Sequence, residues 1–194
     1  MGKSVNAFLA KAGSLIVELK ERADVSPFIV SELNALFPKV KEAMVKIKEL
    51  ETNIESIAKT LKHYDLFQSA LGVGPITAAT MLVLLCNPEV FKNGREFAAY
   101  IGLAPKSSGS DGKNFVTHIP KKYECNNEVR TLLVQCAHAI CRSKHKSDWV
   151  SSILARKPKK VAIIAVANKL ARQLWIMAKK GEKFERRFIL AAAQ

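Results

Sequence analysis

The sequence predicts an all-α protein in which a helical arm precedes a compact helical domain. Apolar residues recur every three or four positions over most segments, glycine and proline separate these segments, and no strong hairpin of alternating strands occurs. The 48% hydrophobic and 25% charged residues are those of a folded chain. A length of 194 residues allows one core with an extended appendage.

Residues 1–61 are expected to form the arm, a helical hairpin or coiled coil. Apolar residues have helical spacing over 3–19 and 31–61, and the later series approaches a heptad repeat. The stretch 23–28 contains turn-forming residues that separate the two helices. The arm either packs on its own domain or associates with a second copy. The later apolar series is Val30, Leu33, Leu36, Phe37, Val40, Met44, Ile47, Leu50, Ile54, Ile57 and Leu61.

Residues 62–194 are expected to form the compact domain from shorter helices. Residues 114–119 could pair briefly as a strand. The apolar stretch 161–178 contains Lys169 and Arg172, so no transmembrane span is expected. The expected helices are 62–70, 75–85, 94–102, 127–144, 147–154 and 160–180.

The net charge of +14 indicates a polyanionic partner, with nucleic acid as the leading class. Residues 1–60 contain nine lysines and arginines and eight acidic residues, net +1, whereas residues 61–194 contain 22 and nine, net +13. The polyanion should therefore meet the second part of the chain.

The four cysteines form no C-x-x-C pair, and the amino terminus does not resemble a signal peptide. Reduced thiols in the cytoplasm are the simplest interpretation. His138 lies near Cys136 and Cys141, but the spacing matches no common zinc pattern, so no metal site is expected.

The Gly72-Val73-Gly74-Pro75 turn is suited to gripping a phosphate. Glycine allows the chain to reverse, and Pro75 is well placed as the first residue of a helix. The amides near Gly74, Ile76 and Thr77 could then point at a phosphate, with the helix dipole behind them. This is the helix-hairpin-helix arrangement, which holds a DNA backbone without reading bases. The alternative is an ordinary tight turn between packed helices.

The segment 105–113 contains three serines and two lysines. A serine becomes a nucleophile only when a base takes its proton and a neighbour stabilises the developing charge. Lys106 and Lys113 could supply the second function, but no base is near in sequence. On this chemistry alone a solvated loop is the better interpretation.

Four ordered blocks within residues 67–183 closely resemble one family: the carboxy-terminal domain of bacterial insertion-sequence transposases that include the pilin-gene invertase and the bridge-RNA-guided recombinases. The arm resembles that family's linker more loosely. The blocks are LGVGPITAA at 71–79, FKNGREFAAYIGLAP at 91–105, RTLLVQ at 130–135 and VANKLAR at 166–172.

The resemblance implies a serine that attacks DNA and becomes covalently joined to it. In the family this serine lies five residues after the proline of the G-L-x-P motif and is usually followed by glycine. Counting from Pro105 gives Ser110, which is followed here by Asp111. A shift of two residues gives Ser108, which does precede a glycine, as the alternative. The ungapped match favours Ser110 because it also places Gly112 and Lys113 correctly.

The resemblance also implies a separate amino-terminal domain with a four-carboxylate D-E-D-D metal site. This chain has four aspartates, and none belongs to a recognisable nuclease fold, so we expect the metal domain to be missing. No cofactor is expected in this chain, and Mg²⁺ is expected only with the missing domain. Alone the chain should not cut DNA.

Further basic clusters fit a groove for a nucleic-acid backbone, although each could equally be a solvated face. Trp175 lies among apolar residues and is expected in the core, whereas Trp149 is open to a base-stacking role. The basic residues are Lys121, Lys122 and Arg130, then Arg142, Lys144, His145 and Lys146, and then Arg156, Lys157, Lys159 and Lys160.

The sequence thus predicts the DNA-binding, serine-bearing part of a transposase acting in DNA transposition and recombination, as a fragment or the product of a truncated gene. The alternative is a non-catalytic helix-hairpin-helix DNA-binding protein with a repair, architectural or regulatory role. DNA is the expected partner, and a structured guide RNA and a homodimer through the arm are further candidates. The expected location is the bacterial cytoplasm, at the nucleoid, with no membrane. The target sequence and the activity of the serine are left open.

Overall fold

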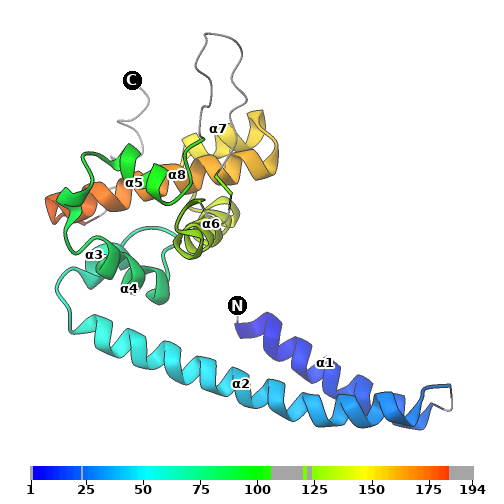
Figure 1. Cartoon of the computed structure of the whole chain (residues 1–194). Coiled ribbons are helices and arrows are strands. Elements are labelled where there is room, and N and C mark those ends of the chain that lie inside the picture. The colour runs from blue at the N-terminus through cyan, green and yellow to red at the C-terminus, as the bar shows by residue number, and fades with distance from the viewer. Residues whose placement is uncertain (1, 23, 106–119, 122–123, 184–194) are drawn as a thin grey trace. The chain divides into compact units, whose positions relative to one another are not determined.

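The computed structural model describes residues 2–22, 24–105, 120–121 and 124–183. These residues form eight α-helices and one short 3-10 helix, without a strand among them (Figure 1). The predicted all-α class is confirmed. The strand suggested for 114–119 lies outside the described residues.

The chain divides into two compact units, Met1–Asn53 and Ile54–Gln194. The first contains α1 (Gly2–Glu21) and most of α2 (Pro27–Lys59), which runs past the division. A short turn that includes an Arg22–Asp24 ion pair separates the two helices. The helices are those predicted for the arm, while the predicted boundary after residue 61 stays a prediction.

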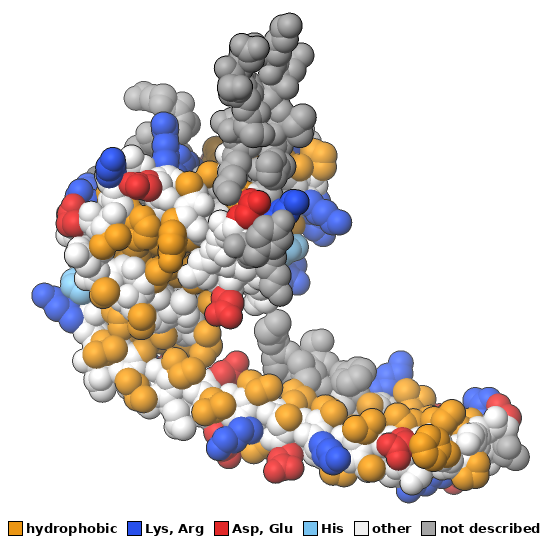
Figure 2. Space-filling view, viewed as in Figure 1, with side chains coloured by type: hydrophobic (Ala, Val, Ile, Leu, Met, Phe, Trp, Pro, Cys, Tyr) orange, Lys and Arg blue, Asp and Glu red, His pale blue; other side chains and the backbone are white. Residues whose placement is uncertain are grey.

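The described residues of the first unit form no buried hydrophobic core. None of its described side chains is buried, and hydrophobic side chains stand exposed along its surface (Figure 2). Gly13 of α1 lies against Phe37 of α2, where an added Cβ would be 3.3 Å from the phenyl ring. Because helices in water depend on packing of an apolar face, this hairpin is weakly supported by its own contacts.

The second unit is built around α8 (Lys159–Lys180), onto which α5 (Gly94–Tyr100), α6 (Asn127–Arg142) and α7 (Asp148–Arg156) pack (Figure 1). Helix α8 is long and apolar enough to cross a membrane, but 56% of its most apolar window is buried inside the unit. It is therefore the core helix of this unit. Its buried residues are Ala162, Ile163, Val166, Ala167, Lys169, Leu170, Ala171, Leu174, Trp175 and Met177.

Short polar residues begin the helices around this core. The side chain of Asn93 accepts hydrogen bonds from the Arg95 and Glu96 amides at the start of α5. Asn126 and Ser147 cap α6 and α7 in the same way. These caps satisfy amide groups that a helix start leaves without partners.

Helix α3 (Tyr64–Gln68), helix α4 (Pro75–Leu84) and the 3-10 helix η1 (Pro88–Val90) complete the unit. Helices α3 and α4 pack on each other, and α3 and η1 also contact α8. The turn between α3 and α4 contains the predicted phosphate-gripping glycines. The fold therefore holds that turn close to the core helix.

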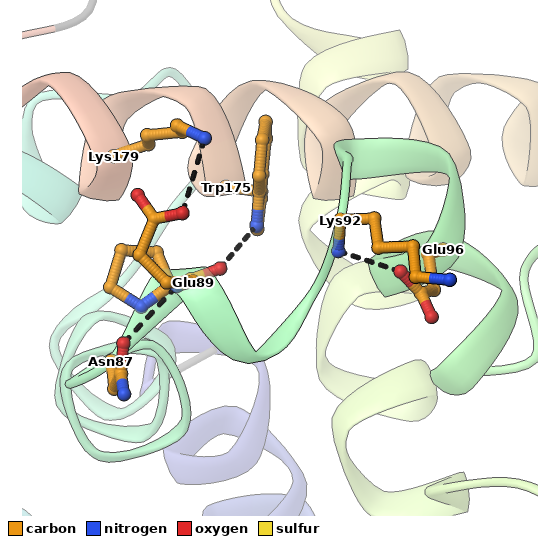
Figure 3. Close-up of polar contacts among 7 residues, drawn as sticks. Asn87, Glu89, Lys92, Glu96, Trp175 and Lys179 are labelled. Atoms are coloured by element: carbon orange, nitrogen blue, oxygen red, sulfur yellow. Dashed lines mark hydrogen bonds and ion pairs between the residues drawn. The ribbon is translucent and has the colours of Figure 1, made fainter.

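Trp175 joins η1 to the core helix. Its indole Nε1 donates a hydrogen bond of 2.9 Å to the Pro88 carbonyl, and Lys179, one turn further along α8, pairs with Glu89 at 3.3 Å (Figure 3). Trp175 is only 8% exposed, which confirms its predicted core position. The indole contact is half-buried and the ion pair is exposed, so the first should matter more to stability.

Replacement of these two residues should separate the two effects. Trp175→Phe should lower the free energy of unfolding by about 1–3 kcal/mol, because the Pro88 carbonyl loses its donor. Lys179→Ala should change it by less than about 1 kcal/mol, because the pair is in water. Urea denaturation followed by circular dichroism measures both, and equal losses would contradict this account of η1.

Candidate functional site

The first glycine of the predicted phosphate turn is required by packing. Gly72 has a φ of 80°, in the left-handed region that favours glycine. A Cβ there would lie 2.7 Å from the Ile140 side chain and 2.9 Å from the Cys136 carbonyl oxygen, both on α6. Gly72 therefore lets the turn approach α6 closely.

The second glycine faces open space. Gly74 is the residue before α4, with an extended backbone, and a Cβ there would meet no atom within 4 Å. Pro75 is the first residue of α4, as predicted, and no described side chain caps this helix start. The backbone amides of Ile76 and Thr77 therefore lie at an uncapped helix start, where the helix dipole favours an anion.

The Thr77 side chain points into the protein. Thr77 is 6% exposed, and its hydroxyl oxygen accepts a hydrogen bond of 3.5 Å from the Cys136 thiol. Burial raises the pKa of Cys136, and hydrogen bonds with Thr77 and the Gly74 backbone oppose this only in part. The thiol therefore stays protonated and links the turn to α6, which leaves Thr77 its backbone amide for any ligand.

The chain is anchored just before the serine segment, residues 105–113. Ser108, Ser110, Lys106 and Lys113 lie outside the described residues, as does Lys122. Just before the segment, Leu103 is buried, and its carbonyl accepts a hydrogen bond of 3.1 Å from Asn168 of α8. The chain therefore enters the segment from a point that the core helix holds in place.

The chain returns from the segment at a second held point. Arg130 of α6 donates a hydrogen bond of 2.6 Å to the Pro120 carbonyl and another of 2.7 Å to the Asn127 side chain. Its guanidinium, predicted to bind DNA, thus holds the chain where the described structure resumes. Sequence reasoning assigned no role to Asn168, although this residue lies in the block at 166–172 and is an amide within the apolar stretch of α8.

Basic side chains line the surface at both ends of α7. Most of them are exposed, and the first turn of α8 contains no acidic residue. Positive charges at a helix start interact unfavourably with the helix dipole, so the lysines at this position do not stabilise α8 through the dipole. The exposed residues are Arg142, Lys144 and His145 before α7, and Arg156, Lys157, Lys159 and Lys160 after it, with Lys121 exposed elsewhere.

Trp149 is half-buried, and its ring is covered by a lysine. The Lys169 ammonium lies 4.1 Å from the ring centroid. Lys169 is buried on α8, and burial lowers its pKa, with a smaller contribution from Arg172. A base could reach at most the uncovered part of the indole, so this contact gives Trp149 a structural role.

No group of three or more histidines, cysteines, aspartates or glutamates lies close enough to hold a metal within the described part of the chain. All four cysteines are free thiols.

Comparisons with known proteins place these features in a family context. Residues 64–151 match the protein-family model of the Transposase IS116/IS110/IS902 family. This region extends from α3 to the start of α7 and contains the glycine turn and the serine segment. These residues, which are a little under half of the chain, are thus similar to a domain of this family.

Curated proteins are also similar to this chain. The Sinorhizobium fredii protein y4pF/y4sB, named as a transposase, is 32% identical over 90% of this chain and 47% of its own length. The transposase for insertion sequence element IS1328 of Yersinia enterocolitica is 27% identical over 88% of the chain and 52% of its length. The transposase for IS1111A of Coxiella burnetii is 28% identical over 87% and 47%. The chain spans about half the length of these relatives.

The two glycines of the turn should respond differently to the same change. Gly72→Ala should lower the free energy of unfolding by about 2 kcal/mol or more, because the φ angle and the contact with α6 both resist a Cβ. Gly74→Ala should change it by less than about 1 kcal/mol. Thermal or urea denaturation measures both. Similar losses for the two variants would contradict the division of roles.

Proposed function

Because residues 64–151 match the model of the Transposase IS116/IS110/IS902 family, we propose that the chain is the DNA-binding, serine-bearing part of an insertion-sequence transposase. Its role is to hold a DNA backbone and to contribute a serine nucleophile to strand cleavage and transfer. The observation that carries the proposal is the uncapped, open start of α4 beside Gly74, within the region matched by the family model.

The glycine turn acts as a helix-hairpin-helix in this proposal. The backbone amides of Ile76 and Thr77 bind one phosphate, and the α4 dipole adds to the attraction. The basic residues around α7, together with Lys121, contact further phosphates. Such contacts position DNA without reading its sequence, and their strength falls with added salt.

Ser110 is the proposed nucleophile, with Ser108 as the alternative. Its hydroxyl oxygen attacks a DNA phosphorus and forms a protein–DNA phosphodiester. The bond from phosphorus to a sugar oxygen breaks, and the serine proton passes to that oxygen, which leaves as a free sugar hydroxyl. Lys106 and Lys113 would stabilise the charge on the phosphate. Mg²⁺ and the D-E-D-D domain implied by the family resemblance would supply the remaining half of the active site.

A non-catalytic role in DNA binding is the second candidate. Asp111 follows Ser110 where the resembled family usually has glycine, and a carboxylate beside the nucleophile repels a phosphate. In that case the chain would bind DNA in repair, in chromosome architecture or in regulation of transposition.

A structured guide RNA is a further proposed ligand of the same basic surface. We propose that the chain acts in the bacterial cytoplasm, at the nucleoid. We also propose that two copies of the chain associate through the arm.

A charge at Gly74 tests the phosphate contact. Gly74→Glu should weaken binding to duplex DNA on the order of tenfold, because the carboxylate would repel the phosphate at the α4 start. Gly74→Gln has nearly the same size without the charge, and should bind within about twofold of the unchanged chain. Fluorescence anisotropy at fixed salt measures both. Equal affinities would show that DNA does not contact this helix start.

The serine assignment requires the complementary domain. With a matching D-E-D-D domain, DNA and Mg²⁺, the chain should form a covalent protein–DNA adduct visible on a denaturing gel. Ser110→Ala should abolish the adduct, whereas Ser108→Ala should retain it. The reverse pattern would identify Ser108 as the nucleophile. An adduct in both variants would show that neither serine by itself is required for the attack.

A further inference from the structure

An apolar groove lies in the second unit where α3, α4 and η1 meet the last turns of α8 (Figure 1). Its volume is about 500 Å³, within the range of sites that hold an organic ligand. Among the residues that line it, Lys62 and His63 are the polar ones. An apolar hollow of this size on a folded unit indicates an interaction site. The apolar lining includes Leu61, Phe67, Val83, Leu85, Pro88 and Ala178.

The groove exposes side chains that the rest of the unit does not cover. Phe67 and Leu85 are buried, but Val83 on α4 is 74% exposed and Leu61 is 49% exposed. Transfer of such side chains out of water is favourable, so a segment that fills the groove stabilises the unit. The groove uses the last residues of α4, and therefore lies away from the helix start that is proposed to bind DNA.

The end of α8 lies at the edge of this groove. Gly181 ends the helix in the left-handed region, with a φ of 69°, and its amide donates a hydrogen bond of 2.8 Å to the Met177 carbonyl. A Cβ on Gly181 would lie 3.9 Å from the imidazole of His63, which lines the groove. Ala178, one turn earlier on α8, lines it too. The chain thus leaves the core helix beside the groove.

From this position we propose that residues 184–194 dock in the groove of the same chain and fill it with the rings of Phe184 and Phe188. Phe184 follows Gly181 by three residues, and three residues of extended chain span about 10 Å, so its ring is within reach of the lining. Docking of a tethered segment is intramolecular and does not depend on protein concentration. A second copy or another protein has no such advantage.

The composition of residues 184–194 matches the groove. Four large apolar residues, Phe184, Phe188, Ile189 and Leu190, lie within seven positions. The two phenylalanines are four residues apart, which places them on one face of a helical turn, with Arg186 on the opposite face. Aromatic rings bury a large area each, so two of them suit an apolar groove. The arginines remain in water.

The reactivity of Cys86 measures docking, because this exposed thiol lines the groove. Maleimide modification is followed by mass spectrometry of the peptide that contains Cys86. Shortening the chain to end at Lys183 should raise the rate on the order of tenfold or more, because the thiol of the full chain reacts only while the segment is undocked. Equal rates in the two chains would overturn the proposal. Cys136 is the control, since it is buried and its modification would report unfolding.

Matched substitutions in the segment test the phenyl rings. Phe188→Ala should weaken docking on the order of tenfold or more, and raise the rate at Cys86 accordingly, because a large apolar side chain no longer leaves water. Arg186→Ala removes a side chain from the opposite face and should leave the rate unchanged. An unchanged rate in Phe188→Ala, or equal increases in both variants, would overturn docking through these rings.

Matched substitutions in the unit test the groove. Val83→Asn places an uncharged polar group in the lining and should raise the rate at Cys86 in the full chain. Val90→Asn makes the same change outside the lining, at a residue that is 69% exposed, and should not alter it. Both sites are exposed, so this pair decides the question even if the shortened chain unfolds. Equal effects would exclude the groove.

Dilution of the full chain identifies the occupant. The rate at Cys86 should be independent of protein concentration, because the segment and the groove belong to one chain. Protection that is lost on dilution would show that a second copy covers the groove, and would overturn docking within the chain. DNA is absent from all of these measurements, so their outcome does not depend on the function proposed above.

Discussion

The close packing of short side chains on α8 is the constraint on which the second unit depends. Ala167 and Ala171 are fully buried, and Gly94 begins α5 so near to α8 that a Cβ would lie 3.2 Å from the Arg172 backbone. This approach fixes α5, and with it the chain that continues to Leu103. Asn168, on the same helix, then holds the Leu103 carbonyl. A single buried helix thus positions both the compact unit and the start of the serine segment.

Much of the helical architecture was predictable because glycine, proline and capping residues mark its limits. The expected helices at 127–144 and 160–180 correspond to Asn127–Arg142 and Lys159–Lys180. The short 3-10 helix was not expected, because its contact with Trp175 joins residues far apart in the chain. The contact of Phe37 on α2 with Gly13 on α1 also escaped prediction, since apolar spacing identifies a face but not what covers it.

The position of the candidate site in the chain was predictable, but the contacts of its individual residues were not. Two glycines in one turn look alike in sequence, yet Gly72 contacts α6 while Gly74 faces open space. The atoms that decide this belong to Cys136 and Ile140, in another helix. Arg130 was predicted to bind DNA as part of a basic cluster, and that stays a prediction, but its hydrogen bond to the Pro120 carbonyl was not predictable. Long-range contacts of this kind leave no local signal in a sequence.

The chain is anchored at two points, one on each side of the serine segment. This separates the residues proposed for chemistry from the residues that hold the fold. Leu103 is fastened to α8 and Pro120 to α6, two helices that pack on each other. Loop-closure entropy changes only slowly with loop length, so the residues between two fixed ends can vary in number and kind at little expense to the fold. Substitutions within the segment, including one that removes a proposed nucleophile, should therefore leave the scaffold around it intact.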